Sequence, residues 1–259
     1  MTKKFVIGVD CGGSGIRAVA ADRHGLQIDE IIKCKLIQGN DVPDPQAVIK
    51  LIRVIAKREA ETPLAIAVCA KRIDDKGKPD RTRDAYLYRL YKEGLSSDVP
   101  IFVRNDTWAI LRAGTVGDGI VIAVGTGSNV ALLREGQEDR PNSSNLGARG
   151  IVAQVGHKVE TKEQLYALLP CVLAAWTAGE SKASSAVERS IDRLAKSAAK
   201  LTKAAPNLPI ILGGGVVEDD GFALALEAKV RELSPLSIVK RIAEKPVMGA
   251  AKLALELLQ

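Results

Sequence analysis

Aromatic side chains are scarce in this chain of 259 residues, in which phenylalanine, tyrosine and tryptophan together make up 3%. Proteins that bind single-stranded nucleic acid stack the bases on such side chains, so the composition argues against this class. The net charge of +6 does not reverse the argument, because 37 basic and 31 acidic residues are interspersed without a basic block. We therefore expect no nucleic-acid partner.

Cysteine is also rare, and none of the four cysteines forms a C-x-x-C pair. The spacing indicates neither a zinc site nor a disulfide framework, and the thiols are expected in a reducing compartment. No apolar run reaches membrane-spanning length, and the run that follows Met1 is too short for a signal peptide. These absences predict a cytoplasmic protein without a membrane partner.

Two glycine turns of similar design lie about half a chain apart. They are Asp10-Cys-Gly-Gly-Ser14 and Gly125-Thr-Gly-Ser128, and an apolar run enters and leaves each of them. This recurrence predicts two related lobes with one phosphate-binding turn in each.

The first turn offers the groups that phosphate chemistry needs. Gly12 and Gly13 let backbone N–H groups approach phosphate oxygens, Ser14 supplies a hydroxyl, and Asp10 supplies a carboxylate for Mg²⁺. A plain hairpin turn, capped by Asp10, is the alternative. The sequence has no G-x-x-x-x-G-K-[ST] motif, and this turn is not G-x-G-x-x-G, so P-loop and Rossmann sites lose their main support.

Later glycine turns extend the pattern. The second phosphate candidate consists of Gly125, Thr126, Gly127 and Ser128. A third turn lies between an apolar strand and a helix, and its glycines would let the backbone pass close to an adenosine: Gly213, Gly214 and Gly215. Ordinary flexible turns are the alternative at both places.

Periodicity and breakers predict an α/β fold. The expected strands are 4–10, 16–21, 28–36, 64–69, 100–103, 119–124, 129–133 and 209–212. The expected helices are 44–57, one near Tyr86, 105–114, 162–177, 182–203, 222–233 and one from Pro246. We expect this last helix to return to the first lobe. The lobes are then 1–114 with 246–259, and 115–245, with nucleotide and substrate in the cleft between them.

Five segments, in order, resemble motifs of one group of proteins. Val6-Ile-Gly-Val-Asp-Cys-Gly-Gly-Ser-Gly-Ile-Arg17 resembles the first phosphate motif of the actin and hexokinase-like ATPase superfamily, in its N-acetylglucosamine kinase and BadF/BadG-type ATPase branch. The other four are Val103-Arg-Asn-Asp106, Gly125-Thr-Gly-Ser128, Leu212-Gly-Gly-Gly-Val216 and Lys245-Pro-Val-Met-Gly-Ala250. The resemblance covers almost the whole chain. It implies a two-lobed ribonuclease-H-like fold of the actin-like ATPases, with a mixed sheet flanked by helices in each lobe.

The resemblance also implies roles for single residues. Asp106 is the implied general base that takes the proton of the attacking hydroxyl, and a helix N-cap is its alternative role. Asn105 and Asn40 are implied to bind substrate hydroxyls, although Asn40 also suits a loop Asx-turn. Ile16 stands where the family commonly has threonine. The segment 145–150 replaces an acidic glycine motif of the N-acetylglucosamine kinases, so specificity for that sugar does not follow.

The function expected from these residues is ATP- and Mg²⁺-dependent phosphorylation of a small hydroxylated substrate, a sugar or amino sugar. Two alternatives stay open. One is a BadF/BadG-type ATPase switch acting on a partner protein, and the other is a catalytically silent nucleotide- or sugar-binding regulator. A homodimer is also left open by the sequence.

Overall fold

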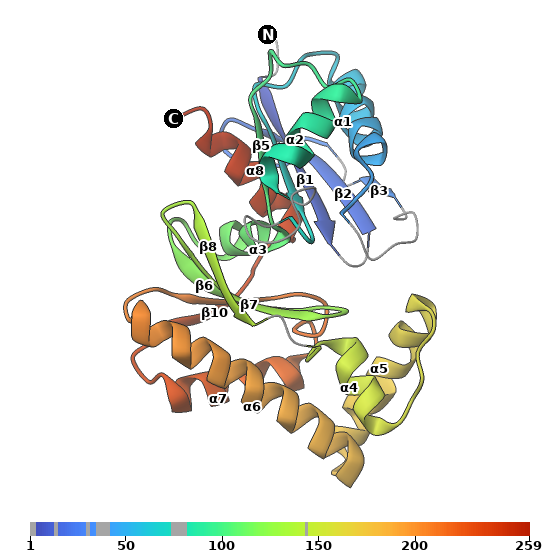
Figure 1. The fold of residues 1–259 in the computed structure, drawn as a ribbon, viewed down its shortest axis with the longest axis vertical. Coiled ribbons are helices and arrows are strands. Elements are labelled where there is room, and N and C mark those ends of the chain that lie inside the picture. Colours follow the sequence, from blue (N-terminus) through green and yellow to red (C-terminus); the bar gives the residue numbers. More distant parts are fainter. Residues whose placement is uncertain (1–3, 13–14, 30–31, 35–41, 74–81, 143–144) are drawn as a thin grey trace. The chain divides into compact units, whose positions relative to one another are not determined.

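The computed structural model describes residues 4–12, 15–29, 32–34, 42–73, 82–142 and 145–259. In these ranges, strands and helices follow one another along the chain, as Figure 1 shows. The chain divides into two compact units, one made of Met1–Ala113 with Ala243–Gln259 and one made of Gly114–Ile242. Each unit contains a five-stranded sheet.

The sheet of the first unit has the strand order β3-β2-β1-β4-β5. β1 and β2 form an antiparallel hairpin, whereas β4 and β5 continue the sheet in parallel with β1. β1 is buried on both faces, which explains why its sequence is an apolar run without polar alternation. The strands are β1 (Phe5–Gly12), β2 (Gly15–Asp22), β3 (Ile32–Cys34), β4 (Ile66–Ala70) and β5 (Ile101–Arg104).

One face of this sheet packs against α1 (Pro45–Glu59) and α2 (Arg83–Lys92). α1 begins where the side chain of Asp44 accepts a hydrogen bond from the Gln46 N–H, and Pro45 occupies the first turn. The apolar residues of the helices and strands form one core, which includes Ile7, Val9, Val48, Ile52, Ile55, Val68, Tyr86 and Leu90.

The other face of β1 carries α8 (Pro246–Glu256), which also packs against α3 (Asp106–Gly114). Gly8 lies against the backbone of Ala251, and Gly249 lies against the carbonyl oxygen of Ala109, so a Cβ at either glycine would collide with backbone. At the far end of the helix pair, Arg112 donates a hydrogen bond to Glu256. α8 thus packs closely on β1, which carries Asp10 near its carboxyl end.

The second unit repeats this topology. Its strand order is β10-β9-β6-β7-β8, with β6 and β7 as an antiparallel hairpin and with β9 and β10 parallel to β6. The strands are β6 (Gly119–Val124), β7 (Ser128–Arg134), β8 (Gln137–Asn142), β9 (Ile210–Gly213) and β10 (Val239–Arg241). Read from β8, the sheet has the same sequence of antiparallel and parallel pairings as the first sheet read from β3.

Four helices belong to the second unit: α4 (Ala148–Val155), α5 (Lys162–Thr177), α6 (Ser181–Ala204) and α7 (Asp220–Leu233). α6 buries an apolar stripe spaced at three and four residues, as an amphipathic helix on a sheet requires. This stripe and the strands share one core, which includes Ile120, Ile122, Val187, Ile191, Leu194, Ala198, Ile210, Leu212 and Phe222.

Three elements were not expected from the sequence. β8 is a charged edge strand that contains Pro141, β10 is an edge strand of three residues, and α4 is a helix of eight residues with Gly147 as its N-cap. β8 and β10 are short edge strands without an apolar run, whereas α4 has apolar residues at helical spacing but only eight residues, too few to distinguish it from a loop. The third strand, expected over 28–36, spans Ile32–Cys34, and residues 35–36 lie outside the described ranges.

The packing of α8 generates a stability prediction. Gly249→Ala should lower the free energy of unfolding by about 3 kcal/mol, the upper end of ordinary overpacking costs, because the added Cβ meets the carbonyl of Ala109 and the backbone nitrogen of Ala113 rather than a flexible side chain. Urea denaturation measures the change. The matched control on the same helix is Lys252→Ala, which removes an ion pair with Glu244 and should cost less than about 1 kcal/mol. Equal effects of the two substitutions would contradict the proposed close contact.

Candidate functional site

The first glycine turn begins at the carboxyl end of β1, where Asp10 is 5% exposed. Gly12 lies beside this carboxylate, since a Cβ there would come within 3.8 and 3.9 Å of the two Asp10 oxygens and meet nothing nearer. Gly13 and Ser14, the other predicted phosphate-binding residues of this turn, lie outside the described residues.

The strand register sets out four side chains in a cross-strand row. Asp10 pairs with Arg17 of β2 on one side and with Cys69 of β4 on the other, and Cys69 pairs with Arg104 of β5. Residues paired across neighbouring strands point to the same face of the sheet, which here is the face opposite Val9 and the α1 core. Near the edge where the parallel strands end, the row therefore places the Asp10 carboxylate between the Arg17 guanidinium and the Cys69 thiol, with the Arg104 guanidinium beyond the thiol.

Asp106 follows Arg104 by two residues and is the first residue of α3. It lies close enough to Asp10 to raise the pKa of that carboxyl. Two acidic residues 96 positions apart in the sequence are thus brought to one edge by the parallel pairing of β1, β4 and β5. A helix N-terminus at this place also favours negative charge on the Asp106 side chain.

Burial is the main cause that raises the pKa of Asp10, to about 7, and the charge of Asp106 raises it further. Arg17 opposes both, with its guanidinium 3.8 Å from the carboxylate. The thiols of Cys11 and Cys69 also have raised pKa values, because they are buried and lie in the field of the same carboxylates. Asp10 is therefore a buried carboxyl beside a second acidic residue, and the neighbouring thiols are held in the protonated form.

These features fit a hydrated Mg²⁺. A buried carboxylate that is destabilised by a second carboxylate gains most from a nearby divalent cation, and carboxylate oxygen is a ligand that Mg²⁺ accepts. Among the described residues, no group of three or more His, Cys, Asp or Glu side chains could hold a metal ion. Mg²⁺ needs no such cage, because it keeps several waters and uses one or two protein carboxylates together with phosphate.

The N-cap of α3 is Asn105 rather than Asp106. The Asn105 Oδ1 accepts hydrogen bonds from the N–H of Thr107 at 3.2 Å and from its hydroxyl at 3.0 Å. The Nδ2 group donates to the carbonyl of Ile73 at 2.8 Å. Asn105 is 3% exposed, and both ends of its amide serve the local fold. Its substrate contact stays a prediction, as does that of Asn40, which lies outside the described residues.

The second glycine turn is held by the start of α4. The N–H of Ala148 donates to the carbonyl of Gly125 at 2.9 Å, and the N–H of Arg149 donates to that of Thr126 at 3.1 Å. The Ser128 hydroxyl accepts from the N–H of Leu146 at 3.0 Å. Gly125 and Gly127 have nothing within 4 Å of a Cβ position, so one side of the turn is open for a ligand to approach.

Two glycines that sequence reasoning missed make this arrangement possible. A Cβ at Gly147 would collide with the carbonyls of Gly125 and Gly127, and one at Gly150 would collide with that of Asn145. No sequence signal pointed to them, because α4 was itself not expected and both collisions involve the backbone of other segments. The segment 145–150 thus has a packing role at the second glycine turn.

The third turn lies next to the second. β6 and β9 are parallel, and Ala123 pairs with Gly213, so Gly213–Gly215 leaves the same sheet edge as Gly125–Ser128. Gly214 has φ of +101°, and a Cβ there would strike the carbonyl of Val124. The N–H of Val216 donates to that same carbonyl at 2.9 Å. The structure therefore brings together the two predicted nucleotide-binding turns of this unit.

Asn129 is a further polar residue that the sequence did not single out. It follows Ser128 and pairs with Ala123, which places it in the same cross-strand row as Gly213. Its Oδ1 is buried and has no hydrogen-bond partner within the described part of the chain. A buried amide oxygen of this kind is costly to leave unpaired, so a ligand hydroxyl or bound water suits this position.

The chain has the fold of known sugar kinases. It aligns with a ROK hexokinase from Thermus thermophilus at 18% identity and a TM-score of 0.69, covering 98% of this chain and all of that one. It aligns with a ROK family glucokinase from Streptomyces griseus, in complex with glucose and AMPPNP, at 19% identity and a TM-score of 0.64, over 97% of this chain and 99% of the other. The predicted actin-like, ribonuclease-H-like α/β fold is confirmed.

The same fold also occurs in a regulator. A ROK family transcriptional regulator, a homolog of the E. coli MLC protein, aligns at 16% identity and a TM-score of 0.68, over 99% of this chain and 78% of that one. The sequence matches no protein-family model and no curated protein. These likenesses therefore establish the fold and do not single out the N-acetylglucosamine kinase and BadF/BadG branch. In the described ranges, no helix has the length and apolar character needed to cross a membrane.

The electrostatics of Asp10 predict how stability depends on pH in metal-free buffer. The pKa of about 7 in the folded chain lies above the ordinary value of 3.8, so the unfolded state loses its proton first as pH rises. The contribution of this group to stability is full below pH 4 and is lost as pH passes 7. At about 1.4 kcal/mol per unit, this shift of about three pKa units corresponds to a loss of roughly 4 kcal/mol.

Urea unfolding at pH 4 to 8 tests this, with Trp108 fluorescence in a Trp176→Phe background reporting on the first unit. Asp10→Asn should remove most of the decline and exceed the parent in stability at pH 8. Asp192→Asn, which alters an exposed pair with Lys196 on α6, should keep the pH profile of the parent. A parent profile that matches that of Asp10→Asn would show that the Asp10 carboxyl is not strained by burial.

Proposed function

We propose that this protein is an ATP-dependent kinase that phosphorylates a hydroxyl of a small substrate, a sugar or amino sugar. The observation that carries the proposal is that Asp106 lies close to the buried Asp10 at the sheet edge beside the first glycine turn. One carboxylate suits the metal and the other suits the proton of the attacking hydroxyl. The shared fold of the hexokinase and the nucleotide-bound glucokinase supports this division.

In this proposal Asp10 would hold Mg²⁺. When bound, Mg²⁺ offsets the negative charge of the ATP phosphates during transfer. Phosphate contacts come from Gly12, Gly13 and Ser14 in the first unit and from Gly125, Thr126, Gly127 and Ser128 in the second. Adenosine is assigned to Gly213, Gly214 and Gly215, and substrate hydroxyls are assigned to Asn40 and Asn105. Because the Oδ1 and the Nδ2 of Asn105 both already have hydrogen-bond partners, we propose that this residue acts chiefly by positioning Asp106.

The chemical role of Asp106 is to accept a proton. As the substrate oxygen forms its bond to the transferred phosphorus, its proton moves to the Asp106 carboxylate, and the bond to the departing ADP oxygen breaks. The alternative role as a helix cap loses its support, because Asn105 makes the capping hydrogen bond to the Thr107 N–H. The first turn of a helix stabilises the ionised carboxylate that a base requires.

A kinase of this kind uses cellular ATP, so we place it in the cytoplasm. The runner-up is a nucleotide- or sugar-binding regulator without turnover, which the shared fold of the ROK transcriptional regulator favours. Coupled measurement of ADP release and sugar phosphate formation, over a panel of sugars and amino sugars, separates the two. A regulator would bind ligand and release no ADP.

Asp106→Asn separates chemistry from binding. The substitution keeps size and leaves the Asn105 cap intact, but it removes the basic oxygen. We expect kcat to fall by about two orders of magnitude or more, with the melting temperature and the affinity for Mg-ATP near those of the parent. The matched control is Asn105→Asp, which keeps an acceptor for the cap and loses the Nδ2 donor to Ile73. It should lower stability by about 1–3 kcal/mol. If Asp106→Asn retains full transfer, the general-base role is wrong.

Gly127→Val tests the second phosphate turn. No atom lies within 4 Å of the new Cβ, so folding should be unaffected, while the side chain occupies the open side of the turn that we assign to phosphate. We expect the melting temperature to stay within about 2 °C of the parent, since an exposed change costs under about 0.5 kcal/mol, and Mg-ATP affinity to fall at least 10-fold. Calorimetric titration measures the affinity. Gly156→Asn is the control, at a left-handed helix end away from the turn (φ +107°). Unchanged affinity in Gly127→Val would remove this turn from the phosphate site.

A further inference from the structure

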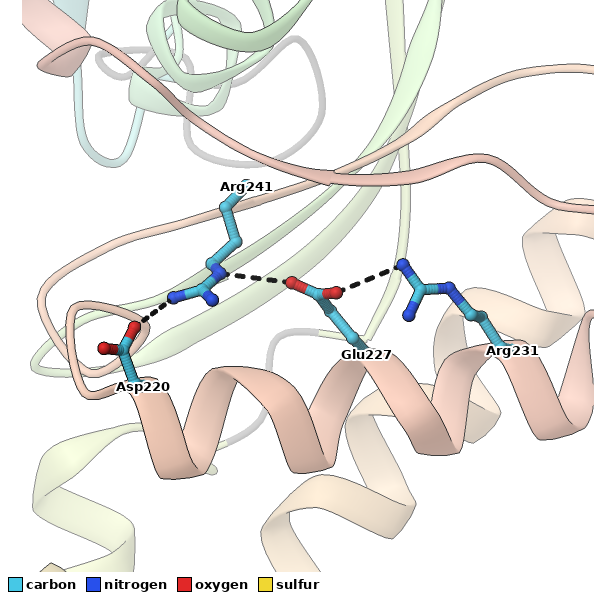
Figure 2. Close-up of polar contacts among 4 residues, drawn as sticks. All are labelled: Asp220, Glu227, Arg231 and Arg241. Atoms are coloured by element: carbon cyan, nitrogen blue, oxygen red, sulfur yellow. Dashed lines mark hydrogen bonds and ion pairs between the residues drawn. The ribbon is translucent and has the colours of Figure 1, made fainter.

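An ion-pair network joins β10 to α7 in the second unit, as Figure 2 shows. Arg241, at the end of β10, donates from Nη1 to Asp220 at 2.7 Å and from Nε to Glu227 at 3.1 Å. Arg231 binds the other oxygen of Glu227 at 3.1 Å. Asp220 is the first residue of α7, and Glu227 lies two turns further along the helix. The planar guanidinium of Arg241 therefore spans the first two turns of α7.

The strand end that carries Arg241 is next to the proposed adenosine turn. β9 and β10 are parallel with Arg241 paired to Leu212, the residue before Gly213. The N–H of Ile242 continues the pairing by donating to the Leu212 carbonyl at 3.0 Å. Arg241 thus sits at the same sheet edge as Gly213–Gly215, one strand away.

α7 is coupled to that turn through a very short connection. Val217 donates its N–H to the carbonyl of Gly214 at 3.0 Å, and Asp219 donates its N–H to the carbonyl of Val216 at 3.2 Å. The Asp219 side chain then caps the helix by accepting from the Phe222 N–H at 2.8 Å. Because each residue from Gly214 to Asp219 lies within this chain of hydrogen-bonded turns, a displacement of the α7 start is passed to the glycine turn.

The two ion pairs of Arg241 differ in their exposure to solvent. The Asp220 side chain is 83% exposed, so water and salt screen that pair. The Glu227 side chain is 12% exposed, and its carboxylate is fixed by hydrogen bonds on both oxygens. Arg231 lies on α7 itself, four residues after Glu227, and within the described ranges it makes no link from the helix to another element. Of the two arginines that bind Glu227, Arg241 is the one that connects α7 to the sheet.

We propose that Arg241 is a positioning residue for nucleotide recognition: by fixing α7 to β10, it holds the Gly213–Gly215 turn in the conformation that accepts the adenosine end of the nucleotide. The inference rests on the proposed function, because it takes this turn as the adenosine contact. Arg241 acts through Glu227, Asp220 and the start of α7. Its influence should be confined to adenosine and leave the phosphate turns and the reacting groups unaffected.

The experiment compares Arg241→Met with Arg231→Met. Both remove one guanidinium from Glu227, and only the first removes the link to β10. Titration with Mg-ADP measures binding through adenosine and phosphates, while titration with magnesium tripolyphosphate measures the phosphate turns alone. We expect Arg241→Met to weaken Mg-ADP about 5- to 10-fold with tripolyphosphate unchanged, and to raise KM for ATP with kcat unchanged. Arg231→Met should match the parent with both ligands. Arg241→Lys should recover little, because an ammonium lacks the planar fork.

Amide hydrogen exchange supplies a readout that needs no ligand. The Val216 amide bonds the Val124 carbonyl and reports on the glycine turn, so it should exchange faster in Arg241→Met than in Arg231→Met. Equal exchange, or an equal loss of Mg-ADP binding in both variants, would overturn the positioning role while the kinase proposal stands. A parent that binds tripolyphosphate but not Mg-ADP would overturn both the adenosine assignment and this inference. If Arg241→Met lowers stability without selectively weakening Mg-ADP binding, the ion pairs have only a structural role and the proposal is wrong.

Discussion

The closeness of two carboxylates, the buried Asp10 and Asp106, is the constraint that shapes the candidate site of the first unit. Parallel pairing of β1, β4 and β5 fixes where Asp10 and Asp106 meet, and the close approach of α8 at Gly8 and Gly249 keeps the strand beneath Asp10 buried. Burial and mutual repulsion make this arrangement unfavourable without a cation, as the raised pKa of Asp10 indicates. A site that costs stability in the isolated chain is typical of a site selected for binding or chemistry.

The two units share one topology, but different groups lie at the corresponding strand ends. In the first unit, the central strand β1 carries Asp10 near its carboxyl end, and Asp106 begins α3 two residues after the end of β5. In the second unit, the central strand β6 ends at Val124, directly before Gly125, and the neighbouring β9 ends at Gly213. The first edge therefore offers charge, whereas the second offers backbone that can be approached closely. The outermost parallel strand of each sheet ends in an arginine. Arg104 at the end of β5 lies over the ring of Phe102, whereas Arg241 at the end of β10 binds Asp220.

Sequence patterns predicted the elements whose burial is strong and regular. β1, β6, α1 and α6 have long apolar runs or stripes, and the glycine turns follow from Asp10-Cys-Gly-Gly and its later counterpart. The missed elements, β8, α4 and β10, are short and owe their conformation to neighbours. The same reason explains why the capping role of Asn105 was not predicted, because its amide is held by the carbonyl of Ile73, 32 positions away. No local pattern encodes such a contact, or the collision that requires glycine at position 147.

The division of labour between Asn105 and Asp106 bears most directly on mechanism. A capping residue must hold its oxygen on a backbone N–H, and a general base must present its oxygen to a substrate, so one side chain performs both roles poorly. Here the cap falls to a neutral amide that is anchored at both ends, while the acid occupies the next position, where the helix N-terminus favours its ionised form. In the apo chain, a proton at this edge is then better accommodated on Asp10, which burial disfavours as an anion. A cation near Asp10 would displace that proton and leave both carboxylates ionised, one toward the metal and one available as a base.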